Sequence, residues 1–204
     1  MSKMYDITLP IYKGMPVYKN KPEKQPEFNT VTNGHVTEST IKLDAHTGTH
    51  IDAPLHMIND GETFETIQLD KLIGDAKVFD LTHVEDGITA NDLQDLNIQK
   101  NDFVLFKTKN TFDEEFNFNF IFLKESGAKY LADQQIRGVG IDSLGIERSQ
   151  EGHPTHKTLF SNDIIVIEGL TFKEVEPDTY HMVASPLKVS GIDASPARVL
   201  LFEK

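Results

Sequence analysis

The chain has 204 residues, 38% of them hydrophobic and 25% charged, and this length and composition predict one globular domain over residues 1–204. Its formal net charge of −12 argues against nucleic-acid binding, which draws on clustered lysine and arginine. The absence of cysteine excludes disulfides and thiolate metal sites, so histidine and carboxylate side chains are the strong metal ligands available. The sequence shows no apolar segment of signal-peptide or membrane-spanning length, and we expect a cytoplasmic protein with no membrane partner.

Strand-like and helix-like patterns alternate along the chain. In chain order we expect a strand at 5–11, a hairpin over 28–46 that turns at Asn33–Gly34, a strand at 76–83, a short helix at 88–96 capped by Thr89, a strand at 102–109, a helix at 122–136, a buried strand at 137–142, a helix at 155–163, a buried strand at 163–170 and a closing strand at 197–204. This succession contains more strand than helix. It predicts an α/β fold with a strand-rich mixed sheet and flanking helices.

The stretch HTGTHIDAPLH, residues 46–56, places three histidines and an aspartate close together. Two β-branched residues around Gly48, with Pro54 soon after, disfavour a helix and predict an extended strand. Because side chains alternate along a strand, Asp44, His46, Gly48, His50 and Asp52 are then expected on one face. Gly48 leaves a gap in the middle of this face, which indicates room for a metal ion and water.

A single histidine is most often a structural residue, but several unpaired polar groups on one buried segment are costly unless a cation neutralises them. Further ligands could come from the second half of the chain. Glu168 ends the apolar strand DIIVIE, and His156 lies at the start of the helix that leads into this strand, so one helix–strand unit could bring the two together. The alternatives are an exposed strand end for Glu168 and an ordinary helix-terminal residue for His156.

The stretch 46–56 resembles the motif H-x-G-T-H-x-D-x-P-x-H of the metal-dependent cyclase-like hydrolases, a family that includes bacterial kynurenine formamidase and isatin hydrolase. The resemblance continues through VGIDSLGIE, HPTHKTLFSNDIIVIEGL and PLKVSGIDASPARVLLF, so it covers most of the chain. It implies a swivelling β/β/α cyclase-like fold, a homodimer or higher homo-oligomer, and one or two divalent metal ions per chain, with zinc or manganese expected. The partner it implies is a small-molecule substrate.

The resemblance also implies roles for single residues. His46, His50 and Asp52 correspond to the ligands of a first metal, and Asp52 would bridge to a second metal held by His156 and Glu168. His56 corresponds to the acid/base, with a third metal ligand as the alternative. Two aromatic residues are expected to bind substrate: Tyr18 stands where formamidases carry a tryptophan, and Phe64 is a second candidate wall of the pocket, for which a place in the core is the alternative.

These residues imply hydrolysis of an amide or cyclic amide bond, arylformamide-like, by metal-activated water with a histidine acid/base. One alternative is a metal-dependent cyclase or dehydratase that acts on a keto or polyketide-like small molecule. Another is a binding or structural module that uses metal only for stability, although a structural site would be closed and would need no acid/base. The chain has no G-x-S-x-G elbow, which argues against a serine hydrolase.

Overall fold

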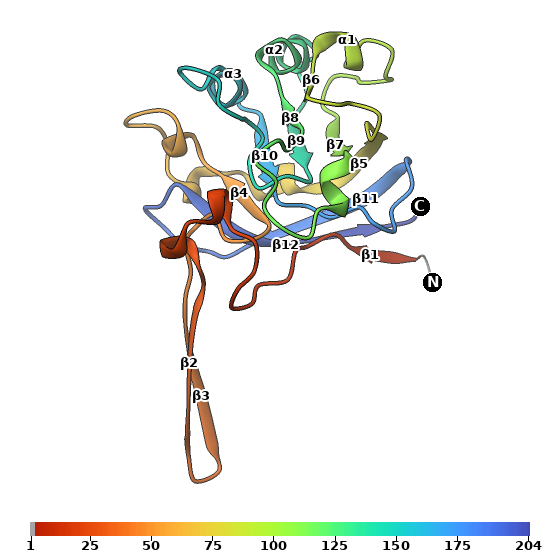
Figure 1. Cartoon of the computed structure of the whole chain (residues 1–204). Helices are drawn as coiled ribbons and strands as arrows, with labels where there is room; N and C mark the ends of the chain where they lie inside the picture. The colour runs from red at the N-terminus through yellow and green to blue at the C-terminus, as the bar shows by residue number, and fades with distance from the viewer. Residues whose placement is uncertain (1–2) are drawn as a thin grey trace.

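A closed sheet forms the centre of the molecule in the computed structural model, which describes residues 3–204 (Figure 1). Within these residues the sheet has eight strands, in the spatial order β1 (Met4–Asp6), β12 (Ala194–Phe202), β11 (Thr179–Pro186), β5 (Ile73–Asp80), β7 (Phe103–Lys107), β9 (Gly138–Ile141), β10 (Ile165–Glu168) and β4 (His50–Asp52). Strands β5, β7, β9 and β10 run parallel, and the other pairs are antiparallel. Because β12 also pairs with β4, the sheet closes into a barrel.

Three α-helices cover one side of this barrel, α1 (Ala90–Leu93), α2 (Glu125–Asp133) and α3 (Pro154–Ser161) (Figure 1). Thr89 begins α1 with a capping box, in which its backbone N–H donates to Asp92 at 2.7 Å. Among residues 3–204, no helix is both long enough and apolar enough to cross a membrane. The remaining short elements are β6 (Gly87–Ile88), β8 (Phe122–Leu123), η1 (Tyr18–Asn20), η2 (Pro22–Lys24), η3 (Pro54–His56), η4 (Phe64–Thr66), η5 (Leu69–Leu72) and η6 (Lys109–Phe112).

Side chains point alternately to the two faces of each central strand, so they contribute to two separate hydrophobic cores. In β10, Ile165 and Ile167 belong to the core inside the barrel, whereas Val166 belongs to the core between the barrel and the helices. Glu168, the last residue of this strand, follows Val166 on the face toward the helices. A continuous apolar run is therefore buried on both faces, and its polar end lies where the barrel meets the helical layer.

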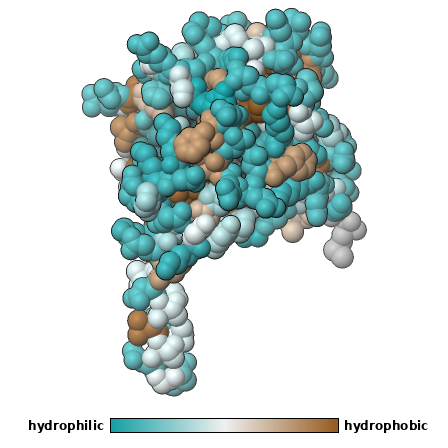
Figure 2. All heavy atoms as spheres, in the orientation of Figure 1, coloured by the Kyte–Doolittle hydropathy of each residue, from teal (hydrophilic) through white to brown (hydrophobic). Residues whose placement is uncertain are grey.

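A two-stranded hairpin, residues 27–42, projects away from the barrel (Figure 1). We call it the arm. It consists of β2 (Glu27–Asn33) and β3 (Val36–Lys42), and all seven residues of each strand are exposed. Its surface is mostly pale, of intermediate hydropathy, whereas the body is mostly hydrophilic (Figure 2).

The structure confirms the mixed α/β fold class and most of the expected elements, including the hairpin that turns after Asn33. Two differences matter. Strand β11, residues 179–186, was not expected from the sequence. The expected strand over residues 44–52 is wrong for its first half, because only His50–Asp52 is extended and paired.

Candidate metal centre

The backbone before β4 is a turn and not an extended strand. The N–H of Thr47 donates to the carbonyl of Asp44 at 3.0 Å, and the Asp44 carboxylate accepts from the N–H of His46 at 3.0 Å. Gly48 then takes a φ of +63°, a conformation that favours glycine. Asp44 pairs with Lys24 at 3.1 Å, so it stabilises this turn and does not face the centre, contrary to the expected alternation.

A close backbone approach fixes the strand that follows. A Cβ atom on Gly169, which has a φ of +69°, would overlap the carbonyl oxygen of Gly48, so these two glycines let the loops touch. The space beside the Cα atom of Gly48 is filled by the side chains of Ile11 and Met15, so it leaves no gap for a metal ion. The antiparallel register of β4 and β10 then sets His50 opposite Glu168.

The structure brings the five predicted ligands together. His50 Nε2 lies 3.3 Å from Glu168 Oε2 and 3.4 Å from Asp52 Oδ1. His46 Nδ1 lies 3.0 Å from the same oxygen, Asp52 Oδ1. His156 Nε2 lies 3.3 Å from Glu168 Oε1 and 3.8 Å from Asp52 Oδ2. Asp52 thus stands at the middle of the cluster, between all three imidazoles.

Each of these three imidazoles is held from behind through its other ring nitrogen. His46 Nε2 lies 2.9 Å from Asp193 Oδ2, and His156 Nδ1 lies 2.7 Å from Glu147 Oε2. His50 Nδ1 lies 2.9 Å from the carbonyl oxygen of Gly48. This arrangement turns the remaining nitrogen of every ring toward the centre, as is typical of metal-ligating histidines.

Three polar atoms at the middle of the cluster lack hydrogen-bond partners. Within residues 3–204, His50 Nε2 and both carboxylate oxygens of Asp52 are buried and make no hydrogen bond. Leaving such groups unpaired costs about 1–3 kcal/mol each, and more for a charged group. A nitrogen lone pair and two carboxylate oxygens that face one another fit a divalent cation.

The charged groups of the cluster shift one another's pKa values. Burial alone would lower the pKa of His46, but the Asp52 and Asp193 carboxylates beside its two ring nitrogens outweigh burial and raise it to about 9. Burial also opposes protonation of His156, yet Glu147 and Glu168 raise its pKa to about 10. Burial alone would raise the pKa of Glu168, but His156 and His50 outweigh burial and hold the pKa well below its usual range. In the absence of an ion, protonated imidazoles therefore balance the carboxylates.

His56 lies at the more exposed side of the cluster, where one of its ring nitrogens comes within 4.8 Å of ligand atoms of both His46 and Asp52. It ends the short helix η3, and its ring centroid is 4.2 Å from that of His46. Its Nδ1 is 3.5 Å from Asp193 Oδ2, and 23% of its side chain is exposed. Burial lowers the pKa of His56, so the ring is neutral at neutral pH and can accept a proton.

Sequence reasoning missed two carboxylates of this site, Glu147 and Asp193. Both follow a glycine and an isoleucine, in GIE at 145–147 and GID at 191–193, and a third such tripeptide ends at Asp142. In each the isoleucine packs in or against a hydrophobic core. An acidic residue directly after a buried isoleucine is a signal that could have identified them.

The two predicted substrate-binding residues lie in different surroundings. Tyr18 is half-buried, and its ring packs edge-on against Phe116 at 5.4 Å between centroids. Burial, together with the charges of Glu168 and Glu147, raises the pKa of the Tyr18 hydroxyl. Phe64 is 4% exposed and belongs to the core inside the barrel, so the structure gives it a packing role.

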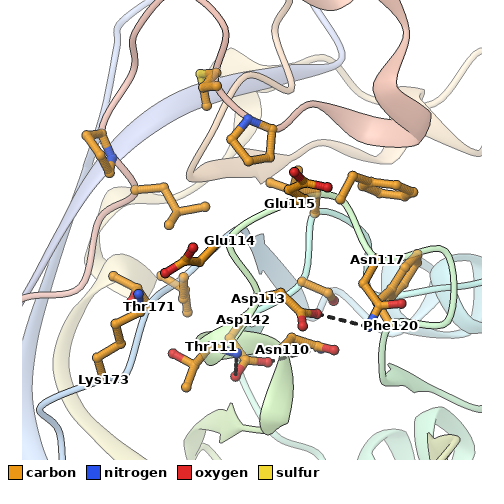
Figure 3. A pocket seen from close by; sticks show the side chains of 18 of the residues that line it. Asn110, Thr111, Asp113, Glu114, Glu115, Asn117, Phe120, Asp142, Thr171 and Lys173 are labelled. Atoms are coloured by element: carbon orange, nitrogen blue, oxygen red, sulfur yellow. Dashed lines mark hydrogen bonds between the residues drawn. The ribbon is translucent and has the colours of Figure 1, made fainter.

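A separate cavity of about 600 Å³ opens between the N-terminal loop and the loop after β7 (Figure 3). The acidic side chains of Asp113, Glu114 and Glu115 lie on its wall, together with Asp142. None of the predicted site residues lines it. The cavity is therefore distinct from the cluster of histidines and carboxylates.

Comparisons with known proteins agree with this geometry. The family model described as "Putative cyclase" matches residues 5–148. Cyclase-like protein 3 of Oryza sativa subsp. japonica is 34% identical, over 85% of this chain and 69% of its own length, and a kynurenine formamidase of Salinibacter ruber is 31% identical, over 81% and 80%.

A solved structure described as a potential metal-dependent hydrolase with cyclase activity is 64% identical to this chain. It covers 100% of this chain and 99% of its own, with a TM-score of 0.96. The family model and the curated relatives each span most of this chain. The chain therefore belongs to the cyclase family, the metal-dependent cyclase-like hydrolases that its histidine motif resembles.

Proposed function

We propose that the protein is a metal-dependent hydrolase that cleaves an amide or cyclic amide bond of a small molecule, in the manner of an arylformamidase. The observation that carries the proposal is the convergence of three imidazoles, each held through its outer nitrogen, on two buried carboxylates whose atoms are partly unpaired. Family membership supports it, because relatives that match most of this chain include kynurenine formamidases.

One or two divalent ions would be held by the cluster, with zinc or manganese as the expected metals. His46, His50 and Asp52 would bind one ion, and Asp52 would bridge to a second ion held by His156 and Glu168. A bound divalent ion supplies Lewis acidity, which lowers the pKa of water and polarises a carbonyl group. The all-nitrogen-and-oxygen set of ligands suits both zinc and manganese.

The chain's own residues would then move protons and orient the substrate. His56, neutral because burial lowers its pKa, would take a proton from the attacking water and deliver it to the leaving nitrogen. The water oxygen first bonds to the carbonyl carbon, and the C–N bond breaks once the leaving nitrogen has received the proton from His56, so no covalent enzyme intermediate is needed. The half-buried ring of Tyr18, packed on Phe116, would form one wall of the substrate site.

The test is metal content by elemental analysis, paired with hydrolysis of N-formylkynurenine and of isatin. We expect one or two ions per chain in the wild-type protein and turnover of at least one substrate. Asp52→Asn should lose metal and at least about 1,000-fold of its turnover, because it removes the central carboxylate. Asp75→Asn is the matched control, since Asp75 pairs with Lys204 at the surface of β5.

Each result of this experiment has a defined meaning. Metal without turnover of either compound would contradict the formamidase-like and isatinase-like assignments while leaving the metal site in place. A wild-type protein that binds no zinc or manganese would overturn the proposal as a whole. Turnover that survives unchanged in Asp52→Asn would remove this cluster from the reaction.

We also propose that the protein forms a homodimer or higher homo-oligomer, and that the arm provides the contact. An isolated two-stranded hairpin is marginally stable in water, yet within the described residues no other strand pairs with the arm. A stable interface takes about 20–30 residues from each partner. One face of the sixteen-residue arm would supply part of that number, and a second copy would return the contact with its own arm.

A further inference from the structure

One carboxylate oxygen lies between two imidazole rings at the open side of the metal centre. Asp193 Oδ2 is 2.9 Å from His46 Nε2 and 3.5 Å from His56 Nδ1. The two rings lie next to each other, with an angle of 45° between their planes. A predicted metal ligand and the predicted acid/base thus share one acceptor atom.

Backbone hydrogen bonds hold Asp193 in this place. The N–H of Ala53 donates to the carbonyl of Asp193 at 2.8 Å, and the N–H of Phe64 donates to the carbonyl of Ile192 at 2.9 Å. The residue after Asp193 pairs with Asp52 in the closure of β12 on β4. The backbone at Asp193 is therefore fixed against both ends of the segment that carries His56.

A carboxylate can only accept hydrogen bonds, so both rings must donate to it. His46 then carries a proton on Nε2, and its Nδ1 faces Asp52 at the centre. His56 carries a proton on Nδ1, and its Nε2 is free to accept a proton from water. An isolated neutral histidine prefers the proton on Nε2, but only weakly, so a hydrogen-bond acceptor beside Nδ1 can reverse the choice.

We propose that Asp193 is a positioning residue that sets the proton-bearing nitrogen of His46 and of His56 together. The effect of Asp193 on catalysis rests on the proposed function. The position of the proton on each ring, in contrast, can be measured without any substrate. Glu147 offers an internal comparison, because it holds His156 from behind at 2.7 Å and has no contact with His56. Removing either carboxylate should weaken metal binding, but only Asp193 should affect the acid/base.

The experiment uses Asp193→Ala and Asp193→Asn, with two readouts that do not need turnover. Long-range nitrogen NMR of histidine-labelled, metal-free protein, at a pH well above the ordinary histidine pKa, reports which nitrogen of His56 bears the proton. We expect the proton on Nδ1 in the wild type and mostly on Nε2 in Asp193→Ala, with Asp193→Asn between them because its amide oxygen can still accept. Competition with a chelator measures the zinc dissociation constant, which should rise about 10–100-fold in Asp193→Ala.

Two control variants separate positioning from general damage. Glu147→Gln should raise the zinc dissociation constant and leave the nitrogen signals of His56 unchanged, and Asp75→Asn should change neither readout. Unchanged His56 signals in Asp193→Ala, or a zinc dissociation constant within twofold of wild type, would overturn the proposal. Shifted signals and weakened zinc binding in a protein that hydrolyses none of the tested amides would leave it standing and contradict the hydrolase instead.

Discussion

Burial and hydrogen bonding compete at the carboxyl group of Asp142, which is 6% exposed. It accepts from the backbone N–H and the hydroxyl of Thr108, both at 2.7 Å, and from Asn110 and Thr111 at 3.2 and 3.1 Å. These bonds favour the ionised form, but burial outweighs them and raises the pKa to about 6 from an ordinary 3.8. The folded state therefore holds this proton more tightly than the unfolded chain does.

A raised native pKa makes the contribution of Asp142 to stability fall as the pH rises from about 4 to about 6. The shift corresponds to about 3 kcal/mol. Asp142→Asn cannot ionise, so the free energy of unfolding of the variant should improve relative to wild type by up to this amount between those pH values. Urea denaturation of both proteins across this range measures it. A difference that stays constant with pH would show that the hydrogen bonds cancel the effect of burial on the pKa, and a change of opposite sign would show that they outweigh it; either result contradicts a raised pKa.

The arm is an element whose two faces differ in chemistry. On one face, cross-strand pairs join Phe28 to Ile41, Thr30 to Ser39 at 2.8 Å, and Thr32 to Thr37 at 2.9 Å, so this face carries no charge. The other face carries Glu38 and the ion pair between Lys42 and Glu27, and also the apolar residues Val31 and Val36. An uncharged, partly apolar face is the side that can be buried against a second copy at the lower cost.

We expect Phe28→Ser with Ile41→Ser to weaken the dimer by about 100-fold or more, because each copy loses two large buried side chains. Val31→Ser with Val36→Ser removes apolar residues from the opposite face and should leave assembly nearly unchanged. Light scattering coupled to gel filtration, over a range of protein concentrations, measures both. A wild-type protein that stays monomeric, or equal effects of the two double variants, would contradict this role of the arm.

At the scale of the whole molecule, closure of the barrel assembles the metal centre from four separate parts of the chain. The closing strands β4, β10 and β12 meet there, and α3 supplies His156. A ligand that binds only the folded state stabilises it by mass action, by about 2.7 kcal/mol when its concentration is 100 times the dissociation constant. The ion should therefore act on global stability as well as on turnover.

Removal of metal with a chelator should lower Tm by roughly 5–10 °C at that degree of saturation, since 1 kcal/mol shifts Tm by about 2–4 °C in a chain of this size. Restored zinc or manganese should bring Tm back. Calorimetry of wild type and of Asp52→Asn, with and without chelator, provides the measurement. The variant should respond weakly, and a Tm of the wild type that does not depend on metal would argue against a tightly bound ion.

The sequence by itself determined the residue types of the centre and most of the elements around it. Ligand-type side chains in HTGTHIDAPLH, the Asn33–Gly34 turn and the capping box at Thr89 are local features, and local features can be read along a chain. The predicted helix and the buried strand after it indicated His156 and Glu168 as further ligands, and the family resemblance implied the same role. The structure brings both into the cluster.

Only the tertiary structure decided how these residues meet. The turn at residues 44–48 replaced an expected strand because Asp44 bonds within the turn and Gly48 meets Gly169, which is far along the chain. Asp193 reaches His46 across 147 residues of sequence, through the pairing of β12 with β4. Contacts of this kind depend on strand register and barrel closure, which the local pattern of one strand does not specify.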